Sequence, residues 1–443
     1  MTANRRGFLR HAAAVAAAGP LVVRASALGA EGAAAPSNRI GLGFIGLGAM
    51  GSGHLRICAQ YPEVQVVAAC DVDRWRRERA KAVVEEAYAA RQVAGKCQAY
   101  SDLRELLARA DVDAVLIATG DRWHGLATVL AAQAGKDVYC EKPVSLTIAE
   151  AQAMREAVRR YHRVFQTGLQ QRSTVEFQRA CQLVRAGAIG QVRIVYVNFP
   201  GTCEDVSLPV EPVPEGLDWE LWLGPAPWRP YNRRFHPYGQ WQGVVPWHFC
   251  RDFGGGNLTS NTVHAFDVVQ WGLGMDASGP VEITPPETGR VPLLTYRYAS
   301  GALCQVVNGR LPRPREFELK GWDEGTHVQP FGAVFVGDGG WIHVGREGYL
   351  RSHPAEIVRQ HHAEGDARPV HNHHQDWFES IRTRGRTACG VEVGARSTTV
   401  SHLGCIAHWL ARPLRWEPTG EEFVGDAEAN RLRSRPMRQP WVL

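Results

Sequence analysis

The sequence predicts an α/β protein with a doubly wound parallel sheet at its N-terminus. A C-terminal α+β domain with a large open, mainly antiparallel sheet follows. Three observations predict this class. A glycine-rich turn follows the first strand-like run, strands alternate with helices up to about residue 167, and strands are then grouped without regular helices. We therefore divide the chain into a leader (1–38), a first domain (39–167) and a second domain (168–443).

The first strand-like run leads into a phosphate-binding pattern. After Ile40–Ile45 come Gly46, Gly48 and Gly51 in the order G-x-G-x-x-G, followed by a predicted helix over 53–60. The first glycine makes a tight turn, the second lets the backbone approach a pyrophosphate, and the third lets the helix pack on the strand. The free N–H groups at the start of the helix bind phosphate.

A second strand-like run supplies the acidic residue that such sites use. Val64–Cys70 ends in Asp71, which lies 20 positions after Gly51. A carboxylate at this place accepts a hydrogen bond from a ribose hydroxyl and repels a 2′-phosphate, so the pattern favours NAD. Arg74 nearby keeps NADP open as an alternative. The order of strand, turn, helix, strand and acid predicts a Rossmann domain.

The rest of the chain gives further helix and strand predictions. Ser101 is expected to cap a helix over 102–109, and Thr147 with Glu150 forms a capping box. Other expected helices cover 74–91, 147–161, 174–186, 260–273 and 374–384, with one more ending at Ala134. Expected strands cover 97–100, 113–118, 137–140, 164–167, 191–199, 293–298, 303–308, 333–336 and 341–344.

The N-terminus has the features of an export signal. Arg5-Arg6 precede an alanine-rich apolar run to Val23, and Ala25-Ser26-Ala27 is a small-residue cleavage site. We interpret this as a twin-arginine signal and expect a periplasmic or otherwise exported protein; a basic helix of the fold is the alternative. Removing four arginines with residues 1–27 lowers the formal charge from +5 to +1. Nothing then favours nucleic acid, and no remaining apolar run is long enough to span a membrane.

Ten cysteines are scattered without C-x-x-C pairs. Cys70 and Cys140 end strand-like runs and are expected to be buried thiols. The spacing predicts neither a disulfide framework nor a zinc site, and we expect no metal. Cysteines without predicted disulfides suit the twin-arginine route, because this route carries proteins that have already folded in the cytoplasm.

Two motifs give the chain a family resemblance. Glu141-Lys142-Pro143 stands at a strand end, and GGGNLTSNTVHAFD lies downstream, with VYCEKPVSLTIAEA, RVFQTGLQQRS, GLDWELWLGPAPW and HHQDWFESIRTR as further matches. The chain resembles the glucose–fructose oxidoreductase and inositol dehydrogenase family, called Gfo/Idh/MocA. The resemblance implies a Rossmann domain, an open-sheet domain that often mediates homo-oligomers, and NAD(P)-dependent oxidation or reduction of a sugar or polyol.

The resemblance also implies catalytic residues. Lys142 would contact the substrate hydroxyl and the nicotinamide ribose, where an ammonium lowers the pKa of the alcohol. His264 is the candidate general base, because imidazole transfers protons near neutral pH. Asp267 is three residues later on the same helix face and could orient His264 or meet substrate. Ser260 stands where many sugar dehydrogenases of the family carry an aspartate, which weakens the case for simple dehydrogenation.

The remaining site predictions fall into two groups. Aromatic faces stack on sugar rings, and amide and guanidinium groups bind hydroxyls. Trp219, Trp222 and Trp228 are as well explained by packing of a long loop. His371, His373 and His374 could suggest a metal site, but adjacent histidines at a helix start are more often exposed or capping, so we expect no metal there. The predicted cofactor-binding residues are Gly46, Gly48, Ala49, Met50, Gly51, Asp71, Thr119, Gly120, His124, Glu141 and Lys142. The predicted substrate-binding residues are Gln171, Arg172, Trp241, Trp247, His248 and Arg251.

Three functions follow from this site. The leading hypothesis is an oxidoreductase that transfers hydride between a tightly held NAD(P) and a sugar, polyol or glycoside. A glycoside hydrolase or lyase that oxidises its substrate only transiently is the first alternative. A non-catalytic sugar-binding relic is the second, although the presence of Lys142 and His264 argues against it.

Overall fold

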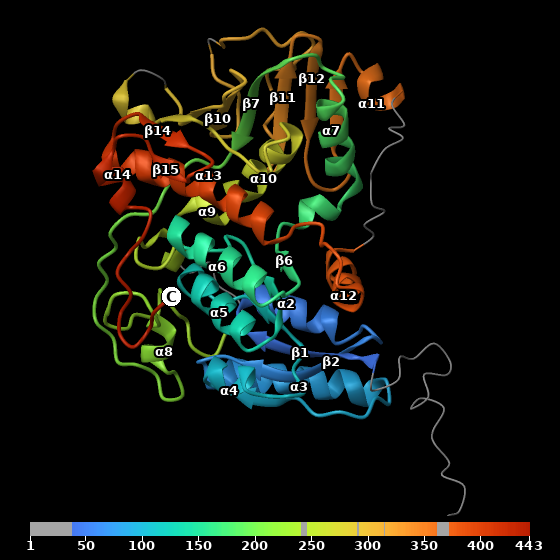
Figure 1. Ribbon diagram of the computed structural model, residues 1–443, viewed down its shortest axis with the longest axis vertical. Coiled ribbons are helices and arrows are strands. Elements are labelled where there is room, and N and C mark those ends of the chain that lie inside the picture. Colours follow the sequence, from blue (N-terminus) through green and yellow to red (C-terminus); the bar gives the residue numbers. More distant parts are fainter. Residues whose placement is uncertain (1–37, 241–245, 290–291, 314, 361–371) are drawn as a thin grey trace, which may run out of the picture.

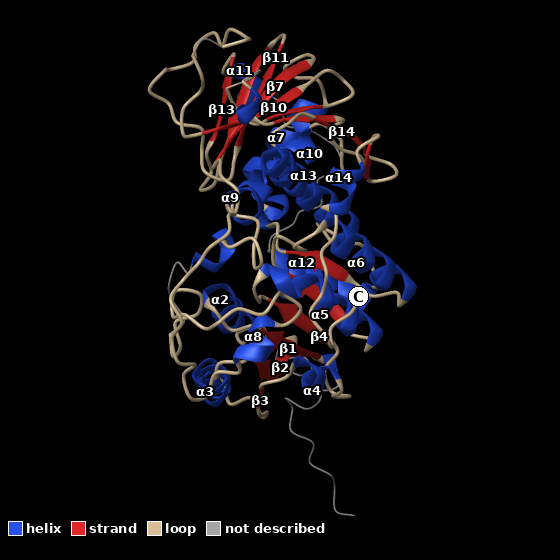
Figure 2. Cartoon of the chain, turned by 90° about the vertical axis from the view of Figure 1, so that its left-hand side faces the viewer, coloured by secondary structure: helices blue, strands red, loops and turns tan. Residues whose placement is uncertain are grey.

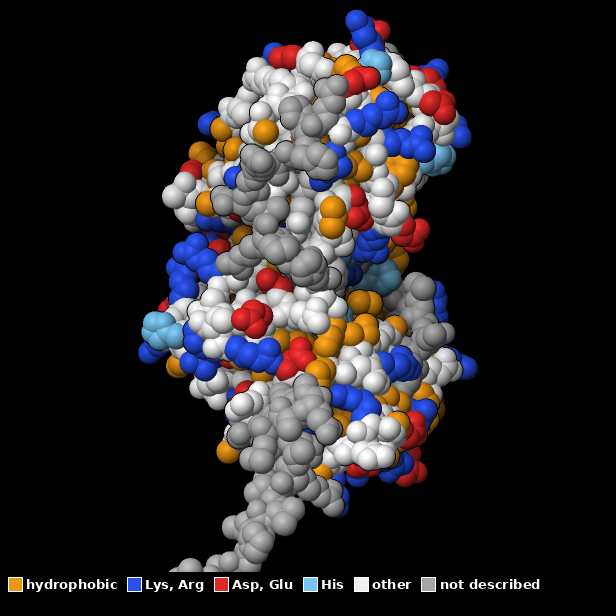
Figure 3. All heavy atoms as spheres, turned by 90° about the vertical axis from the view of Figure 1, so that its right-hand side faces the viewer, with side chains coloured by type: hydrophobic (Ala, Val, Ile, Leu, Met, Phe, Trp, Pro, Cys, Tyr) orange, Lys and Arg blue, Asp and Glu red, His pale blue; other side chains and the backbone are white. Residues whose placement is uncertain are grey.

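The computed structural model describes residues 38–240, 246–289, 292–313, 315–360 and 372–443. The predicted export signal, Trp241 and His371 lie outside these ranges. Within them, no helix is both long enough and apolar enough to cross a membrane. Basic and acidic side chains are interspersed on the face shown in Figure 3.

The first domain is a parallel sheet in the strand order β3-β2-β1-β4-β5-β6 (Figure 1). The order reverses between β1 and β4, which pair in parallel, so their carboxyl ends form the switch point where such sheets bind ligands. This confirms the predicted fold class. The strands are β1 (Ile40–Ile45), β2 (Val64–Cys70), β3 (Gln98–Tyr100), β4 (Ala114–Ile117), β5 (Asp137–Cys140) and β6 (Phe165–Thr167).

The helices of this domain differ from prediction at several ends, and two of the differences have a clear cause. The helix after the glycine turn begins at Ala49 rather than Gly53, because Gly48 serves as its N-cap. The side chain of Asp102, not Ser101, caps the short helix that follows β3. The helices are α2 (Ala49–Cys58), α3 (Arg74–Ala90), α4 (Leu103–Leu107), α5 (Asp121–Gln133) and α6 (Ile148–Arg160).

The second domain is built on a mixed sheet in the order β13-β12-β11-β7-β10-β9-β8-β14-β15. Only β7 and β10 pair in parallel among these strands, so the predicted, mainly antiparallel sheet is confirmed. The strands are β7 (Val192–Asn198), β8 (Glu282–Thr284), β9 (Thr295–Arg297), β10 (Leu303–Val307), β11 (Ala333–Gly337), β12 (Gly340–Val344), β13 (Leu350–His353), β14 (Leu414–Glu417) and β15 (Glu422–Phe423).

Three helices lie between this sheet and the first domain (Figure 2): α7 (Val175–Arg185), α10 (Thr262–Gly272) and α13 (Val391–Leu410). Their apolar side chains form one core with the inner face of the sheet. The helix predicted over 260–273 is two helices, α9 (Asn257–Ser260) and α10, and Asn261 lies between them. The break places Ser260 at a helix end that faces the first domain.

Further helices complete the second domain. They are η4 (Gln170–Ser173), α8 (Trp219–Leu223), η5 (Pro246–Phe249), η6 (Pro286–Thr288), α11 (Glu356–Gln360), α12 (His373–Thr383) and α14 (Ala427–Arg431). Two segments of this domain return to the first domain. Trp377 and Phe378 of α12 join the core around β1 and β2, and the ring of Trp441 meets that of Trp123 at a centroid distance of 4.9 Å. All ten cysteines are buried free thiols.

Candidate functional site

A cavity of about 490 Å³ lies at the switch point of the parallel sheet. Its wall on the first domain is formed by the carboxyl ends of β1, β2, β4 and β5 and the turns that follow them. Residues of the second domain, including Trp222, Trp247 and Ser260, form the opposite wall. The cavity is therefore closed on two sides, as a dinucleotide site requires.

The glycine turn after β1 is shaped for a phosphate group. Gly46 has a φ of +87°, and a Cβ there would lie 2.7 Å from the backbone of Ala118 and Thr119. A Cβ on Gly51 would lie 2.0 Å from the carbonyl oxygen of Gly46. Gly48 caps α2 without a side-chain hydrogen bond, which leaves the helix N-terminus open to an anion. These residues fit the pyrophosphate of a dinucleotide.

Asp71 is fixed at the end of β2. Its carboxylate accepts hydrogen bonds from the backbone N–H groups of Leu47 (2.7 Å) and Asp73 (2.9 Å), and it lines the cavity. Arg74, which kept NADP open, instead pairs with Glu215 at 3.5 Å and does not line the cavity. The basic residue of α3 that does line it is Arg76.

Lys142 joins the two domains at the inner end of the cavity. Its Nζ donates to the carbonyl oxygen of Ser260 over 2.7 Å, so the ammonium lies at the break between α9 and α10. Glu141 beside it lines the cavity, but its Oε1 already contacts His54 Nε2 (2.9 Å) and the Gln170 amide (3.0 Å). Burial opposes ionisation, yet these contacts and the nearby charges lower the pKa of Glu141 to about 2.

Three residues at or near the predicted site have side-chain polar atoms without a hydrogen-bond partner among the described residues. These are His264 Nδ1, Ser260 Oγ and both amide atoms of Gln171, and all are buried. Burial, followed by the charges of Lys142 and Arg346, holds the pKa of His264 well below its usual value. The imidazole is therefore neutral at physiological pH, and its unpaired Nδ1 is available for a hydrogen bond. Unpaired buried polar atoms are costly. Ser260 lines the cavity, where a polar ligand would stabilise its hydroxyl group, whereas His264 and Gln171 are not among the residues that line it.

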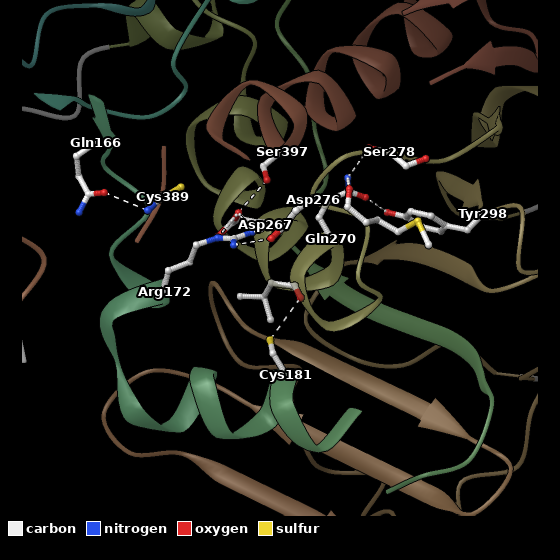
Figure 4. Close-up of polar contacts among 12 residues, drawn as sticks. Gln166, Arg172, Cys181, Asp267, Gln270, Asp276, Ser278, Tyr298, Cys389 and Ser397 are labelled. Carbon is white, nitrogen blue, oxygen red and sulfur yellow. Dashed lines mark hydrogen bonds and ion pairs between the residues drawn. The ribbon is translucent and has the colours of Figure 1, made fainter. Parts of the chain in front are cut away.

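Asp267 does not contact His264. Its carboxylate instead accepts hydrogen bonds from Arg172 Nε and Nη2 (2.8–3.0 Å) and from Ser397 Oγ at 2.8 Å, as Figure 4 shows. Arg172 also pairs with Asp276 at 2.7 Å. The predicted roles of Asp267 in orienting His264 and of Arg172 in binding substrate are corrected here. Both side chains belong to a buried ion cluster. This cluster links η4 to α10; η4 carries Gln171 and α10 carries His264.

The other predicted site residues divide between the cavity and its surroundings. Trp247, His248, Thr119, Gly120 and His124 line the cavity. The ring nitrogens of His124 lie 2.6 Å from the carbonyl oxygen of Pro143 and 3.1 Å from that of Thr119, so His124 ties the ends of β4 and β5 together. Arg251 lies outside, with its guanidinium 4.0 Å from the ring centroid of Trp409. His373 and His374 bond to Ser173, Thr167 and His54.

Family models match both domains. The model described as the NAD-binding Rossmann fold of an oxidoreductase family covers residues 40–169, and its companion for the C-terminal alpha/beta domain covers 201–307 and 346–443. The chain belongs to the Gfo/Idh/MocA oxidoreductase family. NAD as the cofactor class is confirmed by this membership.

Individual relatives of this Gfo/Idh/MocA protein cover different shares of it. Myo-inositol 2-dehydrogenase of Thermotoga maritima is 27% identical over 281 residues, which are 61% of this chain and 68% of that enzyme. A glycosyl hydrolase family 109 protein of Shewanella pealeana is 33% identical over 166 residues, 34% of this chain and 36% of that protein.

Solved structures agree on the fold. Levoglucosan dehydrogenase in complex with NADH and L-sorbose is similar with a TM-score of 0.56 and 17% identity, covering 86% of this chain and all of that one. At this identity the likeness shows the fold and not the substrate.

Among the cavity residues of this Gfo/Idh/MocA protein that were not predicted as site residues are Asp121, Arg122 and Trp222. Asp121 and Arg122 begin α5 and line the cavity, and Trp222 packs against Arg122. All three lie in segments that have recognisable sequence signals. Asp121 and Arg122 follow the end of a parallel strand, where ligand-binding residues gather, and that position was the available signal. Their burial and their unpaired atoms are visible only in the structure.

Proposed function

We propose that this protein is an exported NAD(H)-dependent oxidoreductase. It would transfer hydride to or from a sugar, polyol or glycoside while keeping its cofactor bound, and it would work as a homo-oligomer. The observation that carries the proposal is the Lys142 ammonium at the inner end of the dinucleotide cavity, 2.7 Å from the carbonyl oxygen of Ser260.

The chain's own residues supply the proton chemistry. The glycine turn and Asp71 would hold a dinucleotide, which would supply the hydride acceptor or donor when bound. Lys142 would hold the hydroxyl oxygen and favour its alkoxide form, because a positive charge lowers the pKa of an alcohol. Neutral His264, whose Nδ1 is unpaired among the described residues, would accept the hydrogen bond of the hydroxyl group and take its proton as the hydride leaves. The Gln171 amide would bind a further hydroxyl.

Retention of the cofactor is supported by a cover segment, defined here as residues 201–240. It is fastened to the first domain by backbone and side-chain hydrogen bonds. Asp218 N–H donates to Val72 (3.1 Å), His236 Nε2 meets Asp73 Oδ2 (3.1 Å), and Trp123 Nε1 donates to Leu221 (2.9 Å). Trp222, Phe235 and His236 of this segment line the cavity. A dinucleotide there would be enclosed, which suits an enzyme exported away from free NAD.

A transient-oxidation glycoside hydrolase or lyase is the second candidate. It is favoured by Ser260, which offers no carboxylate beside Lys142, and by the partial match to a glycosyl hydrolase family 109 protein. Both candidates return the cofactor to its starting state within one cycle. They differ in their products.

Product analysis separates the candidates. We expect the mature protein, given mixed sugars and glycosides, to turn over without stoichiometric release of free NADH. One oxidised and one reduced sugar would support the oxidoreductase, whereas released aglycone would support the hydrolase or lyase. The measurement is chromatography of products beside the absorbance of free and bound NADH. Steady accumulation of free NADH with a single oxidised sugar would refute the closed cycle.

A further inference from the structure

Arg122 is a buried cation on the wall of the cavity. Its residue is 3% exposed, and Nη1 has no hydrogen-bond partner among the described residues. Nε donates to the carbonyl oxygen of Trp222 over 2.8 Å, and the guanidinium carbon lies 3.6 Å from the Trp222 ring centroid. The cover segment therefore holds the guanidinium in place without satisfying Nη1.

The charge of Arg122 is only partly balanced. Asp121 is the nearest acidic residue in sequence, yet the two side chains form no ion pair, and Asp121 Oδ2 is itself unpaired. Burial raises the pKa of Asp121 to about 7, so its carboxyl group is protonated for part of the time near neutral pH. Burial also lowers the pKa of Arg122 to about 9. A buried cation of this kind is costly, and an anionic ligand would relieve the cost.

The unpaired nitrogen lies next to the phosphate-shaped turn. A Cβ on Gly46 would meet Ala118 and Thr119 at the end of β4, and a Cβ on Gly120, the next residue, would lie 2.3 Å from Arg122 Nη1. The glycine turn therefore lies beside the end of β4, and the Arg122 guanidinium lies beside the residue that follows that end. Two helices, α2 and α5, also begin at this switch point, and both N-termini favour an anion.

We propose that Arg122 binds the pyrophosphate of the cofactor and that Trp222 holds it there, so that closure of the cover segment and retention of NAD depend on each other. The inference rests on the tightly held cofactor of the proposed function. A carboxylate on the sugar substrate is the other anion that could reach the cavity, and the experiment below distinguishes the two.

The test is equilibrium binding to mature protein stripped of cofactor with charcoal, using NAD⁺, ADP and adenosine as probes. We expect Arg122→Gln to weaken NAD⁺ and ADP binding about 10- to 100-fold, the usual worth of a hydrogen bond to a charged group. Adenosine, which lacks phosphate, should bind within about twofold of the parent protein. Arg122→Lys should fall between, because it keeps the charge but loses the planar stack.

The comparison of ADP with adenosine protects the test from partial misfolding, which would weaken both probes alike. Arg79→Gln, an exposed arginine paired with Glu86 on α3, is the control for the change in net charge. Unchanged NAD⁺ and ADP affinity in Arg122→Gln would overturn the proposal. Loss of glucuronate binding to the NAD-loaded variant, with ADP binding intact, would also overturn it by assigning Arg122 to the substrate. If the parent protein binds NAD⁺ weakly, tight retention fails, but selective loss of ADP binding would still support Arg122.

Discussion

Replacing Lys142 by Met should lower turnover by about 10²–10³-fold and leave the cofactor bound. The substitution removes the ammonium that holds the substrate hydroxyl, and such charge stabilisation contributes about 10²–10³-fold or more to the rate. It does not touch the glycine turn or Asp71. The measurement is turnover with the best sugar substrate found, beside the NAD(H) released on denaturation.

Lys136→Met is the matched control. Lys136 is a buried lysine of the first domain and, like Lys142, donates to a backbone carbonyl, that of Arg109 at 2.7 Å. It precedes β5, at the opposite end of the strand from Lys142. This variant should keep its activity. A Lys142→Met protein that retains near-normal turnover would remove Lys142 from the mechanism.

Breaking the buried Arg172–Asp267 pair should cost about 3–5 kcal/mol in the free energy of unfolding. Arg172→Met leaves the carboxylate of Asp267 buried, with Ser397 as its one remaining side-chain partner among the described residues. The measurement is urea unfolding of the parent and variant proteins. Because the ion cluster positions Gln171 and His264, turnover should fall as well, even at temperatures where the variant is folded.

Two further variants separate the ion pair from general packing. Asp276→Asn removes the outer, partly exposed partner of Arg172 and should cost less than about 1 kcal/mol. The double variant Arg172→Met with Asp267→Leu removes both buried charges and should recover part of the loss. Equal destabilisation by Arg172→Met and Asp276→Asn would contradict the dominant role of Asp267.

Much of the first domain could be predicted because its signals are local. Buried parallel strands are continuous apolar runs, and the strand Asp137–Cys140 was predicted at its observed bounds. The long helix α13 was missed for a physical reason. It is buried on most sides between the two domains and carries Ser and Thr among its buried residues, so it has no polar face to mark a helical period.

The site was predictable only in part. Glycine conformation and strand-end positions identify Gly46, Asp71 and Lys142, since each depends on backbone geometry. The partners of charged side chains depend on burial and on segments far apart in the sequence. For that reason the sequence could not tell that Arg172 and Asp267 satisfy each other, or that Arg122 does not have a full set of partners.

The absorbance spectrum of the gel-filtered mature protein, recorded during titration with sugars, tests the central claim most directly. The account predicts about one nicotinamide cofactor per chain, which elutes with the protein and changes redox state when a substrate sugar is added. It should appear in the supernatant only after denaturation. A protein that elutes without nicotinamide, or whose bound cofactor keeps its redox state with every sugar and glycoside tried, would contradict the account.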